Sequence, residues 1–179
     1  GIVTEKDLEC GLKVSNRAKQ LINQFCINST GGNIDALERY AFDNKTWYEL
    51  LDWHYDVLKL ESHDLLESFI LYMEKGRYYK DRFYQPRVNP LKRDVDAMQD
   101  LFDDKLDEIF INHPSRVGKT QIVKFGYLFY GSKYPEKSNL YTAYSDKITS
   151  GFYDGILELM YDPTYKYAEI FPENIKTRI

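Results

Sequence analysis

The chain has 179 residues, 43% of them hydrophobic and 29% charged, a composition typical of one soluble globular domain with or without a helical appendage. Its formal net charge of −4 argues against an extended nucleic-acid-binding face, because such faces are rich in lysine and arginine. No apolar run approaches the roughly 18 residues of a membrane span, and no signal peptide is expected. Cys10 and Cys26 lack a metal-ligand pattern and are interpreted as reduced structural thiols.

Residues 1–75 are predicted to form an all-helical N-terminal region without a catalytic constellation. A break at residues 29–33 contains two glycines and separates stretches in which apolar residues recur at helical spacing. Ser62 is expected to cap a further helix at its N-terminus. The isolated histidines and the tryptophans are interpreted as packing, interface or surface residues; they are Trp47, Trp53, His54 and His63.

Residues 76–90 are predicted to form a basic, aromatic linker in which Pro86 and Pro90 block regular helix. From Lys75 to Arg93 the only acidic residue is Asp81. Tyrosine and phenylalanine alternate with the basic residues, so this stretch is suited to gripping phosphate or stacking a base. An equally weighted alternative is a solvated linker whose rings pack on the core.

Residues 91–179 are predicted to begin an α/β domain. A helix over 91–105 precedes an apolar strand over 108–112, a loop, a helix, a second strand over 139–144 and a helix capped by Ser145 or Asp146. A short helix is expected near 165–170. The alternation predicts a P-loop NTPase-type parallel sheet flanked by helices, incomplete at this length.

The loop over residues 113–120 carries the strongest chemical signal. It ends in Gly118-Lys119-Thr120, where glycine permits close approach of the backbone to phosphate, lysine supplies a cation and threonine offers a hydroxyl to Mg²⁺. His113 occupies the position where the general motif has its first glycine. The predicted strand–loop–helix context favours phosphate binding over an ordinary helix cap.

Several ordered blocks over residues 80–175 resemble the large subunit of tailed-phage terminases. They include Phe83-Tyr84-Gln85-Pro86-Arg87, the loop 114–120, Ala143-Tyr144-Ser145-Asp146 and Ile170-Phe171-Pro172. Pro114 and Arg116 match that family's loop, whereas Ser115 stands where a second proline is common. Residues 1–75 carry no assignable resemblance.

The resemblance implies the ATPase part of a motor that packages viral DNA into a capsid, with a nuclease in a further C-terminal region. It implies ATP and Mg²⁺ as cofactors, double-stranded viral DNA, a small subunit and a portal as partners, possible homo-oligomers on the portal, and the host cell cytoplasm as location. Catalytic roles fall on Lys119, on Arg116 as a finger in cis and on Thr120, which would also bind the metal. Adenine contacts are expected from Tyr84, Gln85 and Arg87. Phosphate contacts are expected from Pro114, Ser115, Arg116, Val117, Gly118, Lys119, Thr120 and Gln121.

No apolar strand ending in Asp-Glu follows the loop before Ile179, so this chain is expected to be inactive in hydrolysis by itself. Two other functions remain open. One is a different P-loop enzyme, either a small-molecule kinase or another nucleic-acid translocase. The other is a helical module that docks a partner and carries a silent nucleotide site.

Overall fold

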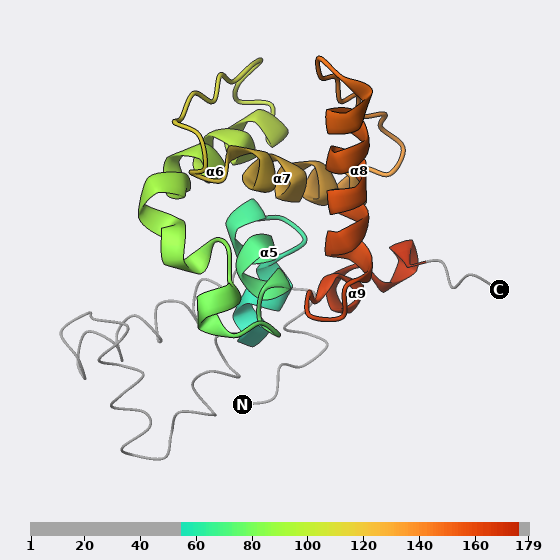
Figure 1. Ribbon diagram of the computed structural model, residues 1–179. Coiled ribbons are helices and arrows are strands. Elements are labelled where there is room, and N and C mark those ends of the chain that lie inside the picture. The colour runs from blue at the N-terminus through green and yellow to red at the C-terminus, as the bar shows by residue number, and fades with distance from the viewer. Residues whose placement is uncertain (1–54, 176–179) are drawn as a thin grey trace. The chain divides into compact units, whose positions relative to one another are not determined.

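Helix α7 (Lys119–Lys133) is the element on which the other long helices pack. The computed structural model describes residues 55–175 of the chain (Figure 1). The chain divides into two units, Gly1–Glu61 and Ser62–Ile179. In the first unit the described residues, 55–61, are helical. The predicted features at Cys10, Cys26, Trp47, Trp53 and His54 lie outside the described residues.

The described part of the second unit is built from helices. The α-helices are α5 (Leu66–Met73), α6 (Val88–Phe102), α7, α8 (Asp146–Tyr161) and α9 (Tyr167–Ile170). Three short 3₁₀ turns accompany them: η1 (Tyr79–Asp81), η2 (Gln85–Arg87) and η3 (Pro172–Asn174). Helix α7 contacts α5, α6 and α8, and α8 continues into contacts with α9. In Figure 1, α7 runs across the long axis of α8.

The predicted parallel sheet is wrong for the described chain, because none of residues 55–175 lies in a strand. The predicted strands at 108–112 and 139–144 are irregular segments on either side of α7 (Figure 1). A strand is defined by hydrogen bonds to a neighbour, and the backbone of 108–112 makes none with any described residue. Their apolar character also does not reflect burial, since Phe110 is 88% exposed and Leu140 is 81% exposed.

The predicted helical spacing of apolar residues agrees with the burial observed in α5. Leu66, Phe69, Ile70 and Met73 of α5 are fully buried, as their spacing of three and four residues predicts. Helix α6 begins at Val88, three residues earlier than expected, so Pro90 lies in its first turn. There a proline costs little, because the first amides of a helix have no partner within it.

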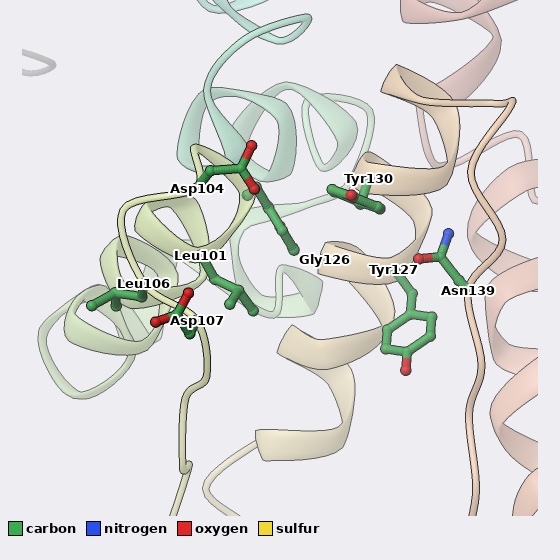
Figure 2. Close-up of a pocket in the computed structure, with 9 residues that line it drawn as sticks. Leu101, Asp104, Leu106, Asp107, Gly126, Tyr127, Tyr130 and Asn139 are labelled. Atoms are coloured by element: carbon green, nitrogen blue, oxygen red, sulfur yellow. The ribbon is translucent and has the colours of Figure 1, made fainter.

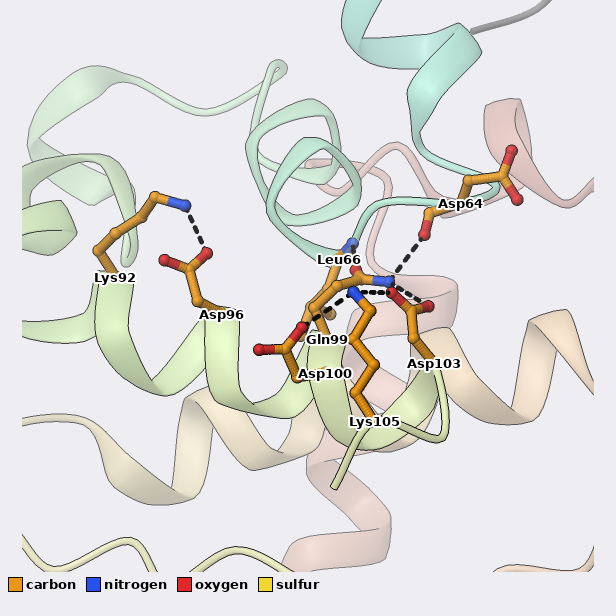
Figure 3. Close-up of polar contacts among 8 residues, drawn as sticks. All are labelled: Asp64, Leu66, Lys92, Asp96, Gln99, Asp100, Asp103 and Lys105. Carbon is orange, nitrogen blue, oxygen red and sulfur yellow. Dashed lines mark hydrogen bonds and ion pairs between the residues drawn. The ribbon is translucent and has the colours of Figure 1, made fainter. Parts of the chain in front are cut away.

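The N-terminus of α5 is satisfied by a side chain from α6 instead of by a local cap. Ser62, the predicted cap, instead donates a hydrogen bond to the carbonyl of Ser68. The amide of Leu66 donates to Gln99 Oε1 at 2.7 Å, and Gln99 Nε2 donates to the Asp64 carbonyl at 3.1 Å (Figure 3). This pairing fixes α5 against α6, because an unpaired amide at a buried helix end is costly.

Aromatic rings fill the interface between α5, α7 and the C-terminal turns. Phe69 of α5 lies 5.5 Å from Phe129 of α7 and 6.1 Å from Phe171, measured between ring centroids. Each fully buried ring of this kind contributes about 1.5–3 kcal/mol through removal of apolar surface from water. A buried hydroxyl pair, Ser132 and Tyr167 at 2.7 Å, joins α7 to α9. These contacts fix the position of α7, and α7 begins directly after the loop over residues 113–118.

Candidate functional site

The backbone of the loop over residues 113–118 turns through two left-handed residues before α7 begins. Arg116 has φ 68° and Gly118 has φ 111°. Gly118 is the residue before the first turn of α7, and its carbonyl accepts from the amides of Gln121 and Ile122. Left-handed residues placed close together bring backbone amides to one side of the chain, which forms a concavity suited to an anion.

Gly118 is required for steric reasons as well as for its backbone angle. A Cβ atom at this position would lie 2.5 Å from Cε2 of Phe83, well inside van der Waals contact. A φ of 111° is also one that side-chain-bearing residues rarely adopt. The glycine of the motif thus allows an aromatic ring from the 76–90 linker to lie against the loop.

Lys119 reaches back across the loop. Its Nζ donates to the carbonyl oxygen of His113 at 2.6 Å, a part-buried contact that closes the loop on itself. The ammonium is thereby held near the start of the loop instead of extending into solvent. A cation held in this way is preorganised for a bound anion and loses little conformational freedom on binding.

The backbone amides around the start of α7 find no acceptor within residues 55–175. No described residue accepts a hydrogen bond from the backbone amides of Arg116, Val117, Gly118, Lys119 or Thr120. The first amides of a helix have no partner within the helix, and the helix dipole places partial positive charge there. Backbone amides and a lysine ammonium are both groups that favour an anion as a partner.

His113, the departure from the general motif, anchors the loop to α6. Its Nε2 lies 2.6 Å from Oδ2 of Asp94, and the two side chains are 26% and 12% exposed. A glycine at this position could not make that contact. Asp94 was not singled out in the sequence, because nothing local connects residues 19 positions apart.

The remaining predicted phosphate-loop residues lie at the surface. Pro114, Ser115, Arg116 and Thr120 are exposed, and Val117 and Gln121 are half-buried. The guanidinium of Arg116 forms no hydrogen bond or ion pair within the described residues, and neither does the hydroxyl of Thr120. Both side chains are accessible to a ligand at the loop.

The three residues predicted to contact adenine differ in how far they are exposed to solvent. Tyr84 is fully buried, and its hydroxyl donates to Oε1 of Glu67 at 2.9 Å. Burial, with the Glu67 carboxylate as the next cause, raises the pKa of Tyr84 well above its ordinary value. In this structure its ring face is not available to stack on a base. Gln85 accepts from Arg82, and Arg87 is exposed.

Phe83 and Arg87 form a pair beside the loop. The Arg87 guanidinium lies 5.5 Å from the Phe83 ring centroid, and its Nη1 donates to the Phe83 carbonyl at 2.8 Å. On its other side the Phe83 ring stacks near Phe125 of α7, with centroids 6.2 Å apart. Phe83 therefore lies next to both Arg87 and Gly118, and through this ring the aromatic linker packs on the loop.

Glu74 fixes this linker in place, although nothing in the sequence marked it. Its two carboxylate oxygens accept from the amides of Phe83, at 2.6 Å, and Tyr84, at 3.0 Å. Burial raises the pKa of Glu74, and these two amides and the nearby Arg77 and Arg82 oppose that rise. The carboxylate thereby sets the position of Phe83 relative to the loop.

Several basic residues of the linker are engaged within the chain. Arg77 donates to Thr164 at 2.8 Å and lies 4.5 Å from the Tyr165 ring centroid. Arg82 donates to the Arg77 carbonyl, and Lys92 pairs with Glu67 at 2.9 Å. Hydrogen bonds and an ion pair within the chain therefore account for these basic side chains. Lys80 and Arg93 are exposed.

Residues 55–175 contain no group of three or more histidine, cysteine, aspartate or glutamate residues that could hold a metal ion. Over the same part of the chain, no helix is both long and apolar enough to cross a membrane. No protein-family model matches the chain, and no similar protein was found among curated proteins or among solved structures.

Proposed function

We propose that the loop over residues 113–120 binds the phosphates of ATP–Mg²⁺. The observation that carries the proposal is the contact of Lys119 Nζ with the His113 carbonyl, across a loop whose following amides have no acceptor among the described residues. The cation and the amides belong to the same short loop, and both prefer an anion. The proposal rests on this loop and α7 alone and requires no sheet.

Roles follow from the positions of the side chains. Lys119 would offset charge on the terminal phosphates, and the amides of Val117 to Thr120 would hold the phosphate oxygens. The exposed hydroxyl of Thr120, in the first turn of α7, would bind Mg²⁺ with the phosphates completing its coordination. Pro114, Ser115 and Gln121 would line the loop.

Arg116 is assigned to the γ-phosphate. Arg116 is exposed and its backbone is left-handed, and its guanidinium forms no ion pair with a described carboxylate. A cation that approaches the phosphate during hydrolysis would stabilise the charge that develops there.

The wider proposal is that this chain is the ATP-binding part of a terminase large subunit, the motor that packages viral DNA. Support comes from the ordered blocks of similar sequence on both sides of the loop. Under this proposal the full motor is an ATPase, its partners are double-stranded viral DNA, the small subunit and the portal, and it works in the host cell cytoplasm.

Calorimetric titrations of the chain with ATP, ADP and adenosine in the presence of Mg²⁺ test the phosphate assignment. Affinity should fall from ATP to ADP, and adenosine should not bind measurably, because the contacts are made to phosphate. Equal affinities for ATP and adenosine would show that the base, and not the phosphate chain, is recognised.

A further inference from the structure

His113 makes two contacts that lead in different directions. Its backbone carbonyl accepts from Lys119 Nζ at 2.6 Å, and its side-chain Nε2 lies 2.6 Å from Asp94 Oδ2. Because an ionised carboxylate can only accept, Nε2 is the donor in the second contact. The carbonyl that holds the Lys119 ammonium is thus tied, within a single residue, to a carboxylate of α6.

Asp94 is a fixed partner for this contact. It lies in α6 next to the fully buried Val95, and its side chain is 12% exposed. Among residues 55–175, His113 is the one group that forms a hydrogen bond or ion pair with the Asp94 side chain. A carboxylate so far removed from water is costly without a donor, so the contact with His113 should persist in solution.

The end of the same loop is held from the same part of the chain. A Cβ at Gly118 would lie 2.5 Å from Phe83 Cε2, and the Phe83 carbonyl accepts from Nη1 of Arg87 at 2.8 Å. Arg87 directly precedes α6, and Asp94 follows about two helical turns later. Asp94 therefore holds the start of the loop, and Arg87, through Phe83, lies at its end.

The C-terminal end of α6 borders a different feature, a pocket of about 420 Å³ that it forms with the middle of α7 (Figure 2). Leu101, Phe102 and Gly126 are among the residues that line this pocket, whereas neither Asp94 nor His113 does. The contact that holds the loop is therefore separate from the pocket, and a carboxylate at that end of α6 can serve as its control.

We propose that Asp94 is a positioning residue for nucleotide binding: it holds the His113 side chain so that the His113 carbonyl keeps the Lys119 ammonium at the loop. This role rests on the proposed binding of ATP–Mg²⁺ at residues 113–120. Asp94 does not contact the phosphates itself, because a carboxylate repels them and one of its oxygens already accepts from His113. Its effect passes through His113 to Lys119.

Calorimetric titration of the full chain with ATP–Mg²⁺ tests this role in matched variants. Asp94→Ala should weaken binding by about five-fold, the equivalent of one hydrogen bond, and His113→Ala, which keeps the backbone carbonyl, should show the same loss. Asp94→Asn should bind within about two-fold of the unsubstituted chain, because its amide oxygen accepts the same hydrogen bond. Asp100→Ala is the control: it removes a carboxylate of α6 that pairs with Lys105 at 3.0 Å (Figure 3), and it should leave the affinity unaltered.

A second background separates positioning from a general structural effect. In Lys119→Ala, the further change Asp94→Ala should alter the affinity by less than about two-fold, since the ammonium that Asp94 positions is gone.

Three results would overturn the role of Asp94 alone: unaltered affinity in Asp94→Ala, an undiminished further loss in the Lys119→Ala background, or equal losses in Asp94→Asn and Asp94→Ala. The last result would point to the charge itself, as in a direct contact with Mg²⁺. No saturable binding of ATP–Mg²⁺ by the unsubstituted chain would instead overturn the proposed function, and this role with it.

Discussion

Gly118 combines two constraints at one residue. Its φ of 111° disfavours any side chain, and a Cβ would overlap Phe83 at 2.5 Å. Gly118→Ala should lower the free energy of unfolding by about 1–3 kcal/mol and weaken ATP binding, because the loop must shift. Chemical denaturation and nucleotide titration measure the two effects.

The steric part of that loss can be separated with a second substitution. In a Phe83→Ala background, Gly118→Ala should cost less than in the unsubstituted chain, since the ring it would strike is gone. Additive losses in the double variant would mean that Phe83 does not press on the loop and that the backbone angle alone demands glycine.

Arg116 bears a left-handed backbone without being glycine. Arg116→Gly should leave the free energy of unfolding within about 1 kcal/mol, because relief of strain offsets the greater freedom of glycine in the unfolded chain. Under the proposed function, the same change in the full ATPase should slow ATP hydrolysis by about 10³-fold while affecting ATP affinity less. An unaltered hydrolysis rate would remove Arg116 from the proposed mechanism.

Glu74 gives the fold a pH dependence that can be isolated. Burial raises its pKa in the folded chain above the ordinary 4.5, so the folded state holds the proton more tightly than the unfolded state. The stability linked to this group is present below pH 4.5 and is lost as pH rises through the raised folded-state value.

Urea unfolding of the unsubstituted chain and of Glu74→Gln across this range tests the assignment. The free energy of unfolding of the unsubstituted chain should fall, relative to the variant, as pH rises above 4.5. A difference between the two proteins that does not change with pH would show that Glu74 titrates as an ordinary exposed carboxyl.

At the scale of elements, the packing of α6 on α7 depends on Gly126. A Cβ there would lie 1.9 Å from Cε of Met98. Because that atom is the end of a flexible methionine side chain that can move aside, Gly126→Ala should lower the free energy of unfolding by about 1 kcal/mol or less, after any gain in helix propensity. Thermal or chemical denaturation measures the change.

Gly151 in α8 provides the matched control, because nothing lies within 4 Å of a Cβ built there. Gly151→Ala should raise the free energy of unfolding by about 0.5–1 kcal/mol, the usual gain in an exposed helix. If the two alanine variants behaved alike, close approach of α6 would not be the reason for glycine at position 126.

Helices were predictable from the sequence where local spacing and burial coincide. The fully buried residues of α5, Leu66, Phe69, Ile70 and Met73, have a spacing of three and four positions that was visible in the sequence. The same spacing holds for the buried residues of α8, which include Phe152 and Leu159. The strands were not, because a strand forms only when its backbone hydrogen-bonds to the backbone of a neighbour. Within the described residues, the apolar runs at 108–112 and 139–144 make no such bond, and the Leu140 carbonyl accepts from the Tyr127 hydroxyl instead.

The candidate site likewise contains residues that could be predicted from the sequence and residues that could not. The loop residues are contiguous and carry a motif, so Gly118, Lys119 and Thr120 could be named from the sequence. Glu74 and Asp94 act across 9 to 19 positions of the chain, through contacts that no local pattern encodes. Burial of Tyr84 likewise depends on Glu67 and on neighbouring elements, so two interpretations of the linker rings, packing on the core or stacking a base, remained open at the level of sequence.

For the molecule as a whole, the loop over residues 113–118 is held by contacts with two other segments. His113 ties it to Asp94 of α6, and Phe83 ties it to the linker that Glu74 anchors. Because a ligand that binds only the folded state stabilises it by mass action, ATP–Mg²⁺ should raise the unfolding temperature of the whole chain. ATP–Mg²⁺ should not raise the unfolding temperature of a variant whose loop cannot bind phosphate.

The most direct measurement is therefore the affinity of the full chain for ATP–Mg²⁺ in two lysine variants. Lys119 and Lys147 both lie in the first turn of a helix, α7 and α8 respectively. Lys119→Ala should weaken ATP binding by about ten-fold or more, the loss of one charge-assisted contact, and Lys147→Ala should bind like the unsubstituted chain. Lys119→Ala binding ATP as tightly as Lys147→Ala would contradict the assignment of residues 113–120 as the phosphate site.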